Sequence, residues 1–309
     1  MRRILLACLM LAVAVSACGQ SVDADTTKTL AQARAGADAA LVKAVKSNMP
    51  LEQPPAGVLE VTSYTSPAGK LAAYITPRPA KAGRYPAVIW ISGGDFNSIG
   101  DFWSEATPDN DQTASAFRRD GIVVMYPSLR GGNANPGSRE GFYGEVDDVI
   151  AAADHLKSLD YVDPQRIYLA GHSTGGTLVM LVSEFTDRFR ASFAFGPVAD
   201  PTLYSSLGAD FLPIAPDNRE AIALRSPILW LGSVRTPLFV LEGADRGNVE
   251  DLEAMKARNH NPLVRFIAAP GYDHFSILAP TTALIAERIL TDTGAKSAIA
   301  LSEADLARR

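Results

Sequence analysis

Ser173 lies between two glycines, each two residues away from it in the chain. Residues 171–176 read Gly-His-Ser-Thr-Gly-Gly, which makes Ser173 the centre of a G-x-S-x-G motif. The motif follows the apolar run IYLA and precedes TLVMLV, a pattern that indicates a strand, a sharp turn and a helix. Such a turn lifts the hydroxyl above the sheet, and the start of the helix behind it favours developing negative charge. We therefore expect Ser173 to act as a nucleophile.

A serine hydroxyl needs a general base, and the sequence contains four histidines. His274 follows the last expected strand in a loop, which fits the chain order Ser, Asp, His that accompanies such a turn. His155 lies on a helix before the nucleophile, His172 is next to Ser173 and is expected to point elsewhere, and His260 lies at a helix end. We predict that His274 is the base.

The base needs a carboxylate that holds its tautomer and stabilises the imidazolium ion. Asp245 is the predicted acid, because it comes just after the apolar run PLFVLEG and before the histidine. Glu242 is the alternative, at the end of the same expected strand. Asp273 is adjacent to His274 in the chain and is poorly placed to reach round to its ring.

Acyl transfer also needs two backbone N–H groups that bind the oxyanion. Thr174, the residue after the nucleophile, supplies one of them. The second is expected from Ser-Gly-Gly-Asp at residues 92–95, where paired glycines let the backbone approach a substrate closely. Gly94 is the predicted donor, with Gly93 and Asp95 as open alternatives.

The elements that would position these residues alternate between short apolar runs and helical patterns. Strands are expected at residues 58–64, 71–76, 87–92, 122–126, 167–170, 191–195, 238–241 and 264–268. Helices are expected at residues 113–119, 145–159, 177–185, 249–258 and 279–290. This alternation predicts an α/β fold with a mostly parallel central sheet and helices on both faces. Residues 200–235 break the rhythm and predict a short helical insertion over the strand ends.

The first residues resemble a bacterial lipoprotein signal peptide. Two arginines precede an apolar run at residues 4–15, which is too short for a permanent membrane span, and Val-Ser-Ala-Cys at residues 15–18 resembles a lipobox. The resemblance implies cleavage before Cys18, acylation of its thiol, and a membrane-anchored protein that faces the periplasm of the bacterial envelope. Ordinary secretion of a soluble protein is the alternative.

Composition excludes several classes of protein. The chain has 309 residues, of which 47% are hydrophobic, and its net charge is −5. That apolar share is too high for a disordered chain, and the acidic balance argues against a nucleic-acid partner. Both cysteines, Cys8 and Cys18, lie in the first 18 residues, so no disulfide is expected in a mature chain. No metal or nucleotide motif is present, and we predict no cofactor and no metal.

The expected organisation has four parts. Residues 1–17 form the signal peptide and residues 18–57 a tether with a helix, whose apolar residues recur at helical spacing between Leu30 and Val45. Residues 58–295 form a single catalytic domain, and residues 296–309 a C-terminal tail. The oligomeric state is left open.

Several motifs in the same order make the chain resemble the α/β-hydrolase superfamily, and within it the catalytic domain of the prolyl oligopeptidase (S9) group. They are SLRGG at 128–132, GEVDD at 144–148, VDPQRI at 162–167, the serine turn, RSPI at 225–228 and TPL at 236–238. The resemblance implies hydrolysis of peptides or esters through an acyl-enzyme, with Ser173 as nucleophile, Asp245 as acid and His274 as base.

Three departures from that group bear on the substrate. Ser92 stands where histidine is frequent, Thr174 stands where an aromatic residue is frequent, and no room is expected before Val58 for a β-propeller. We therefore predict a serine hydrolase for a small ester or a short peptide, and favour a carboxylesterase over an S9-type peptidase. A non-catalytic lipoprotein that keeps this fold as a binding module is the alternative from another class.

Overall fold

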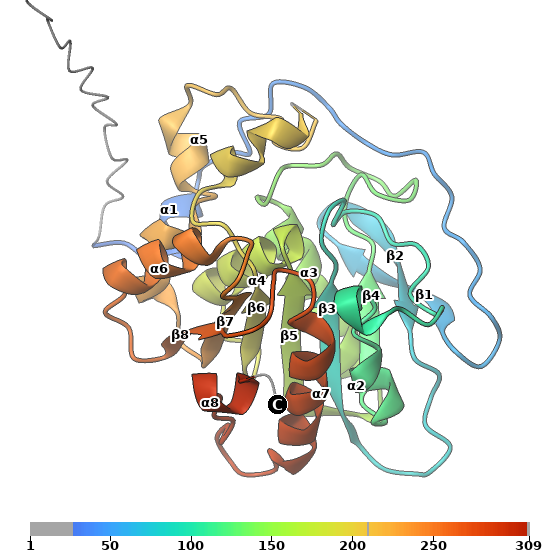
Figure 1. The fold of residues 1–309 in the computed structure, drawn as a ribbon. Helices are drawn as coiled ribbons and strands as arrows, with labels where there is room; N and C mark the ends of the chain where they lie inside the picture. The colour runs from blue at the N-terminus through green and yellow to red at the C-terminus, as the bar shows by residue number, and fades with distance from the viewer. Residues whose placement is uncertain (1–26, 209, 308–309) are drawn as a thin grey trace, which may run out of the picture.

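The computed structural model describes residues 27–208 and 210–307, and one eight-stranded sheet runs through them (Figure 1). The predicted signal peptide and Cys18 lie outside the described residues. No helix in the two described ranges is both long and apolar enough to cross a membrane.

The sheet has the strand order β1-β2-β4-β3-β5-β6-β7-β8. The strands are β1 Glu60–Ser66, β2 Gly69–Ile75, β3 Tyr85–Ile91, β4 Val123–Pro127, β5 Val162–His172, β6 Ser192–Phe195, β7 Leu238–Gly243 and β8 Val264–Ala269. β1 and β2 pair antiparallel, and so do β2 and β4. All pairs from β4 across to β8 are parallel, so the carboxyl ends of six strands meet at one edge of the sheet.

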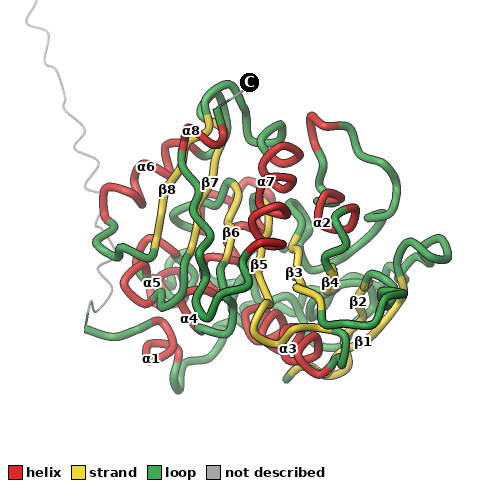
Figure 2. The backbone as a smooth tube through the Cα atoms, turned by 90° about the horizontal axis from the view of Figure 1, so that it is seen from below, coloured by secondary structure: helices red, strands yellow, loops and turns green. Residues whose placement is uncertain are grey.

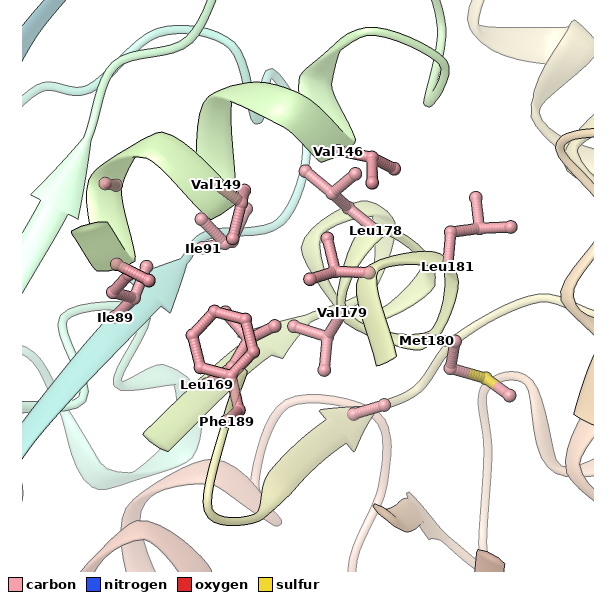
Figure 3. Packing of buried hydrophobic residues seen from close by; sticks show 14 of the residues in the cluster. Ile89, Ile91, Val146, Val149, Leu169, Leu178, Val179, Met180, Leu181 and Phe189 are labelled. Carbon is pink, nitrogen blue, oxygen red and sulfur yellow. The ribbon is translucent and has the colours of Figure 1, made fainter. Parts of the chain in front are cut away.

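Helices cover both faces of this sheet because side chains alternate along its buried strands. In β3, Ile89 and Ile91 face one apolar cluster, with α3 (Glu145–Ser158) and α4 (Thr174–Phe185). Figure 3 shows Ile91 beside Val149 of α3, with Ile89 and Val179 of α4 among the other side chains of this cluster. Val88 and Trp90 face the opposite cluster, with α2 (Ser115–Arg119) and α7 (Leu278–Thr291). Figure 2 shows the two helix layers on either side of the row of strands. The predicted mostly parallel sheet with two helical layers is confirmed.

Helices are also found beside β7 and β8 and in the predicted insertion. Helix α6 (Val249–Arg258) packs against β7 and β8. The predicted insertion holds α5 (Arg219–Ala223) and three 3₁₀ turns, at Pro201–Leu207, Pro227–Leu229 and Leu231–Ser233. The first of these turns brings Tyr204 and Leu207 to the carboxyl edge of the sheet, beside the serine turn.

The N-terminal helix is shorter than its spacing predicts. Helix α1 spans only Leu30–Arg34, whereas the apolar spacing continues to Val45. Beyond α1, backbone groups are used in tertiary contacts: the Ala39 carbonyl accepts from Arg225, and the Val42 N–H donates to the Pro213 carbonyl. These contacts hold the segment in a non-helical conformation, so tertiary structure overrides the helical pattern.

The C-terminal residues pack against the domain. Arg190 donates to both carboxylate oxygens of Asp292 at 2.7 and 2.9 Å, and Asp292 also accepts from the Ser297 hydroxyl and the Ala298 N–H. The short helix α8 (Glu303–Leu306) follows, with Leu306 buried in the cluster on the α7 face. The described part of the predicted tail is therefore continuous with the core.

Candidate active site

Ser173 lies on a strained turn between β5 and α4. Its backbone angles are φ 54° and ψ −115°, and its N–H donates to the Phe195 carbonyl at 2.7 Å. A positive φ at a residue other than glycine costs free energy and is found where function requires it. The tight packing needs Gly175, because a Cβ atom there would lie 2.3 Å from the Ile91 carbonyl oxygen of β3. The predicted turn is thus present, with Ser173 partly exposed at its tip.

His274 follows β8 in a loop and contacts a carboxylate from the neighbouring strand. Its Nδ1 atom lies 2.9 Å from Oε2 of Glu242, whose side chain is fully buried, while the side chain of His274 is 14% exposed. The Glu242 carboxylate also accepts from the Gly243 N–H at 2.7 Å and the Asn248 N–H at 2.9 Å. Three hydrogen bonds thus satisfy a buried carboxylate and orient the imidazole.

The carboxylate that contacts His274 is that of Glu242 and not that of Asp245, the predicted acid. Strand β7 runs to Gly243, two residues beyond the predicted end, so Glu242 belongs to the strand and points to the histidine. Asp245 lies on the exposed turn beyond it, where its N–H donates to the Tyr272 carbonyl at 3.0 Å. Glu242, the alternative from the sequence, takes the place next to His274.

Asp273 has a local role in the histidine loop. Its Oδ1 atom accepts from the Phe275 N–H, the Ser276 N–H and the Ser276 hydroxyl at 2.8–3.0 Å. The hydrogen bonds from Ser276, followed by the one from Phe275, lower the pKa of Asp273. Asp273 therefore stabilises the turn that carries His274 and does not contact its ring.

The imidazole of His274 occupies a slot beside Gly196, where the absence of a side chain leaves room for the ring. Gly196, just after β6, has φ 56°, and a Cβ atom there would lie 2.4 Å from Cε1 of His274. Asn248 closes the slot, since its side-chain amide donates to the Gly196 carbonyl at 2.8 Å while its N–H binds Glu242. Neither residue was predicted from the sequence.

The two predicted oxyanion donors are close to one another. The Thr174 hydroxyl donates to the Gly94 carbonyl at 3.0 Å, which ties the start of α4 to the glycine loop after β3. The Gly93 N–H is engaged by Oε1 of Gln112 at 3.3 Å. Among the described residues, the Gly94 N–H has no hydrogen-bond partner, so it stays available to a substrate oxygen. This supports Gly94 over Gly93 as the second donor.

These residues surround one pocket of about 480 Å³, within the usual size range of small-molecule sites. Its lining includes Gly94, Ser173, Thr174, His274, and also Tyr204, Leu207 and Phe275. A larger hollow of about 710 Å³ beside Trp230 and His260 contains none of the predicted site residues. The smaller pocket is therefore the candidate active site.

Tyr204 was not predicted from the sequence. Its hydroxyl lies 2.9 Å from Oγ1 of Thr177 in α4. Burial raises the pKa of Tyr204, and hydrogen bonds with Thr177 and Ser173 offset this only in part, so the phenol stays protonated. Only its place in the insertion could have pointed to it.

The described residues show no group of three or more His, Cys, Asp or Glu side chains arranged to hold a metal ion. The chemistry available from them is that of Ser173, His274 and Glu242: a nucleophile, a base and a carboxylate that orients it.

Sequence comparison extends these observations. The sequence model of the prolyl oligopeptidase family matches residues 108–284. The chain is 23% identical over 227 residues to dipeptidyl-peptidase 5 of Porphyromonas endodontalis. The matched stretch covers 66% of this chain and 32% of the relative. An uncharacterized peptidase, YuxL of Bacillus subtilis, is 27% identical over 204 residues, or 59% of this chain and 30% of that protein. The chain thus spans about a third of the length of these curated relatives.

Solved structures share the fold. A puromycin-hydrolyzing peptidase of Mycobacterium tuberculosis superposes with a TM-score of 0.59 at 22% identity, over 78% of this chain and 41% of that one. The esterase Pf2001 of Pyrococcus furiosus has a TM-score of 0.59 at 18% identity, over 80% of this chain and 98% of that one. The predicted α/β-hydrolase fold is confirmed. With a family match over more than half its length, the chain belongs to the prolyl oligopeptidase family of serine hydrolases.

Proposed function

We propose that this protein hydrolyses ester or amide bonds through an acyl-enzyme on Ser173. The observation that carries the proposal is the hydrogen-bonded pair of His274 and Glu242, which opens into the same pocket as the serine on its strained turn. A binding protein has no need of a buried carboxylate that orients a histidine in the same pocket as a serine on a strained turn.

The reaction follows from the positions of these groups. His274 takes the proton of the Ser173 hydroxyl as the oxygen attacks the carbonyl carbon, and Glu242 stabilises the imidazolium ion that forms. The N–H groups of Gly94 and Thr174 bind the oxyanion. His274 then protonates the leaving group, and water, activated by the same histidine, releases the acyl group from Ser173. Base assistance of this kind contributes a rate factor of about 10²–10⁴.

We favour a carboxylesterase that acts on small, uncharged acyl groups. Apart from the two histidines, the described residues that line the pocket include no Asp, Glu, Lys or Arg side chain. Leu207 and Phe275 are 56% and 44% exposed at its rim, which suits an apolar acyl chain. A substrate with a free α-amino group would be expected to require a carboxylate in reach of that amine.

A serine peptidase is the second candidate. The names of the relatives favour it, since they include a dipeptidyl-peptidase and a puromycin-hydrolyzing peptidase. The neighbour with esterase in its name superposes equally well, so the shared fold is compatible with either substrate class.

Two assays test the proposal. Wild-type protein should be labelled by a fluorophosphonate probe at neutral pH, and Ser173→Ala should not be labelled. Hydrolysis of p-nitrophenyl acetate and butyrate should then exceed that of alanine and proline p-nitroanilides in kcat/KM. Faster turnover of the anilides would favour the peptidase, and absence of labelling in folded wild-type protein would contradict the hydrolase.

We also propose that the protein is anchored to the bacterial cell envelope through an acylated Cys18. The lipobox-like sequence at residues 15–18 supports this. Two or more acyl chains hold a protein at a membrane, since each buried methylene adds about 0.8 kcal/mol. Metabolic labelling with an alkyne fatty acid should mark the wild type and not Cys18→Ala, and equal labelling of both would contradict the anchor.

A further inference from the structure

His172 is a second histidine in the pocket, and the catalytic steps above do not use it. It ends β5 directly before Ser173, and its side chain is fully buried. Its Nε2 atom lies 2.9 Å from the carbonyl oxygen of His274, and the two rings are 4.5 Å apart between centroids. Because a carbonyl only accepts, His172 must donate the Nε2 proton, which makes its Nδ1 atom an acceptor.

Gln112 supplies the matching donor. Its Nε2 atom lies 2.9 Å from Nδ1 of His172 and 2.9 Å from Oδ1 of Asn110, so both amide protons are used. Its Oε1 atom lies farther from Nδ1 of His172, at 3.2 Å, and accepts the N–H of Gly93 at 3.3 Å. The backbone carbonyl of Gln112 accepts from the Trp90 indole at 2.8 Å, which fixes the residue to β3. Each polar atom of the amide therefore has a partner in the glycine loop at residues 92–95 (the oxyanion loop), in β5 or in its own loop.

The direction of these hydrogen bonds does not depend on pH in the neutral range. Burial, together with the neighbouring His274, lowers the pKa of His172 to about 3. A neutral ring with a proton only on Nε2 is thus retained at neutral pH, and the ring can accept from Gln112 and donate to His274 at the same time.

We propose that His172 and Gln112 are positioning residues that hold the histidine loop and the oxyanion loop in register with the nucleophile. His172, which precedes Ser173 in the chain, donates to the backbone carbonyl of His274. The side-chain amide of Gln112 contacts His172 and also binds the N–H of Gly93, next to the oxyanion donor Gly94. A displacement of about 1 Å between reacting groups can cost a factor of about 10² in rate. The inference rests on the proposed hydrolase function.

The test compares three single variants in the full chain. His172→Phe keeps a ring of similar size and removes both hydrogen bonds, while His172→Gln keeps an amide donor near the place of Nε2. Gln112→Leu removes the amide and leaves His172 intact. We expect His172→Phe to lower kcat on p-nitrophenyl butyrate by about 10–100-fold with KM changed less than about twofold. His172→Gln should restore part of kcat, and Gln112→Leu should lower kcat by about 10-fold.

The double variant His172→Phe/Gln112→Leu shows whether the two residues act through one contact. If they do, Gln112→Leu lowers kcat by a smaller factor in the His172→Phe background than in the wild type. Circular dichroism and the Tm of each variant show whether it folds. If His172→Phe does not fold, Gln112→Leu, which lies on the partly exposed loop, decides the question.

The outcomes separate this inference from the proposed function. Wild-type protein that neither reacts with a fluorophosphonate nor hydrolyses the ester disproves the function itself. An active wild type with unchanged kcat in folded His172→Phe or Gln112→Leu overturns the positioning role. The same conclusion follows if His172→Gln is as slow as His172→Phe and the two substitutions are additive, because the loss would then come from packing alone.

Discussion

Nδ1 of His274 lies 2.9 Å from Oε2 of Glu242, and the acid of this pair belongs to a strand. Glu242 is fully buried and receives two further hydrogen bonds from backbone N–H groups. Because Glu242 lies on a strand and its carboxylate accepts three hydrogen bonds, it has little freedom to rotate away from the imidazole. The pair therefore presents the base to the pocket in a fixed orientation and tautomer.

Replacing Glu242 should therefore impair the reaction far more than replacing Asp245. We expect Glu242→Gln to lower kcat on p-nitrophenyl butyrate by about 10²–10⁴-fold, because an amide can stabilise neither the tautomer nor the imidazolium ion in the same way. Asp245→Asn is the matched control and should stay within about twofold of the wild type. Steady-state kinetics on both variants checks this, and a larger loss in Asp245→Asn would reverse the assignment.

A methyl group in the histidine slot should displace the base. Gly196→Ala places a Cβ atom 2.4 Å from Cε1 of His274. We expect kcat to fall by at least about 10-fold, with a loss of about 1 kcal/mol of unfolding free energy from the positive φ. Gly232→Ala is the control, since nothing lies within 4 Å of its Cβ position. Equal activity of the two variants would show that the slot does not constrain the histidine.

The buried ion pair of Arg130 and Asp148 should be important for stability. Arg130 donates from Nε and Nη2 to the two oxygens of Asp148, each at 2.9 Å, and the Asp148 side chain is fully buried. Arg130→Leu leaves that carboxylate without its partner, which typically costs about 3–5 kcal/mol. Urea denaturation should show the loss, and a midpoint like that of the wild type would refute it.

Acid should weaken the attachment of the C-terminal residues through Asp292. Burial opposes ionisation of Asp292, but hydrogen bonds from Arg190, the Ala298 N–H, Tyr168 and Ser297 outweigh it and hold its pKa well below the ordinary 3.8. The stabilisation is complete above that value and is lost as the pH falls below it toward the folded-state pKa.

Asp292→Asn removes this contribution at every pH. The variant should be less stable than the wild type at pH 7, and the difference between the two should shrink as the pH is lowered below about 4. Tm measured from pH 7 to pH 2 follows the difference. A difference that stays constant over this range would contradict the role of the carboxylate charge.

Features of the fold and the site could be predicted from the sequence where a few neighbouring residues determine them. The serine turn was predicted correctly because glycine spacing and flanking apolar runs specify it within a few residues. The choice between Glu242 and Asp245 depends on where β7 ends, and its pairing with β8 up to Gly243 decides that. The signal in the sequence that favours Glu242 is its place within the apolar run PLFVLEG, because a charged side chain on a buried strand needs a partner.

In the N-terminal segment, a local sequence pattern predicts the wrong conformation. Its helical spacing is a local signal, but contacts with Arg225 and Pro213, far away in the sequence, determine its conformation. Tyr204 reaches the pocket from a 3₁₀ turn and Gln112 from a loop, and neither segment carries a periodic sequence pattern. Such contacts depend on how the insertion and the loops fold over the sheet, which no single window of the sequence contains.

The position of the acid on β7 also affects which neighbouring residues can change without loss of the catalytic pair. The turn at residues 244–246 carries no reacting group, and Asp245 and Arg246 on it are exposed. Exposed turns accept insertions and substitutions more readily than strands do. Sequence variation in this turn is thereby separated from the catalytic groups, so changes there should leave the pair of His274 and Glu242 in place.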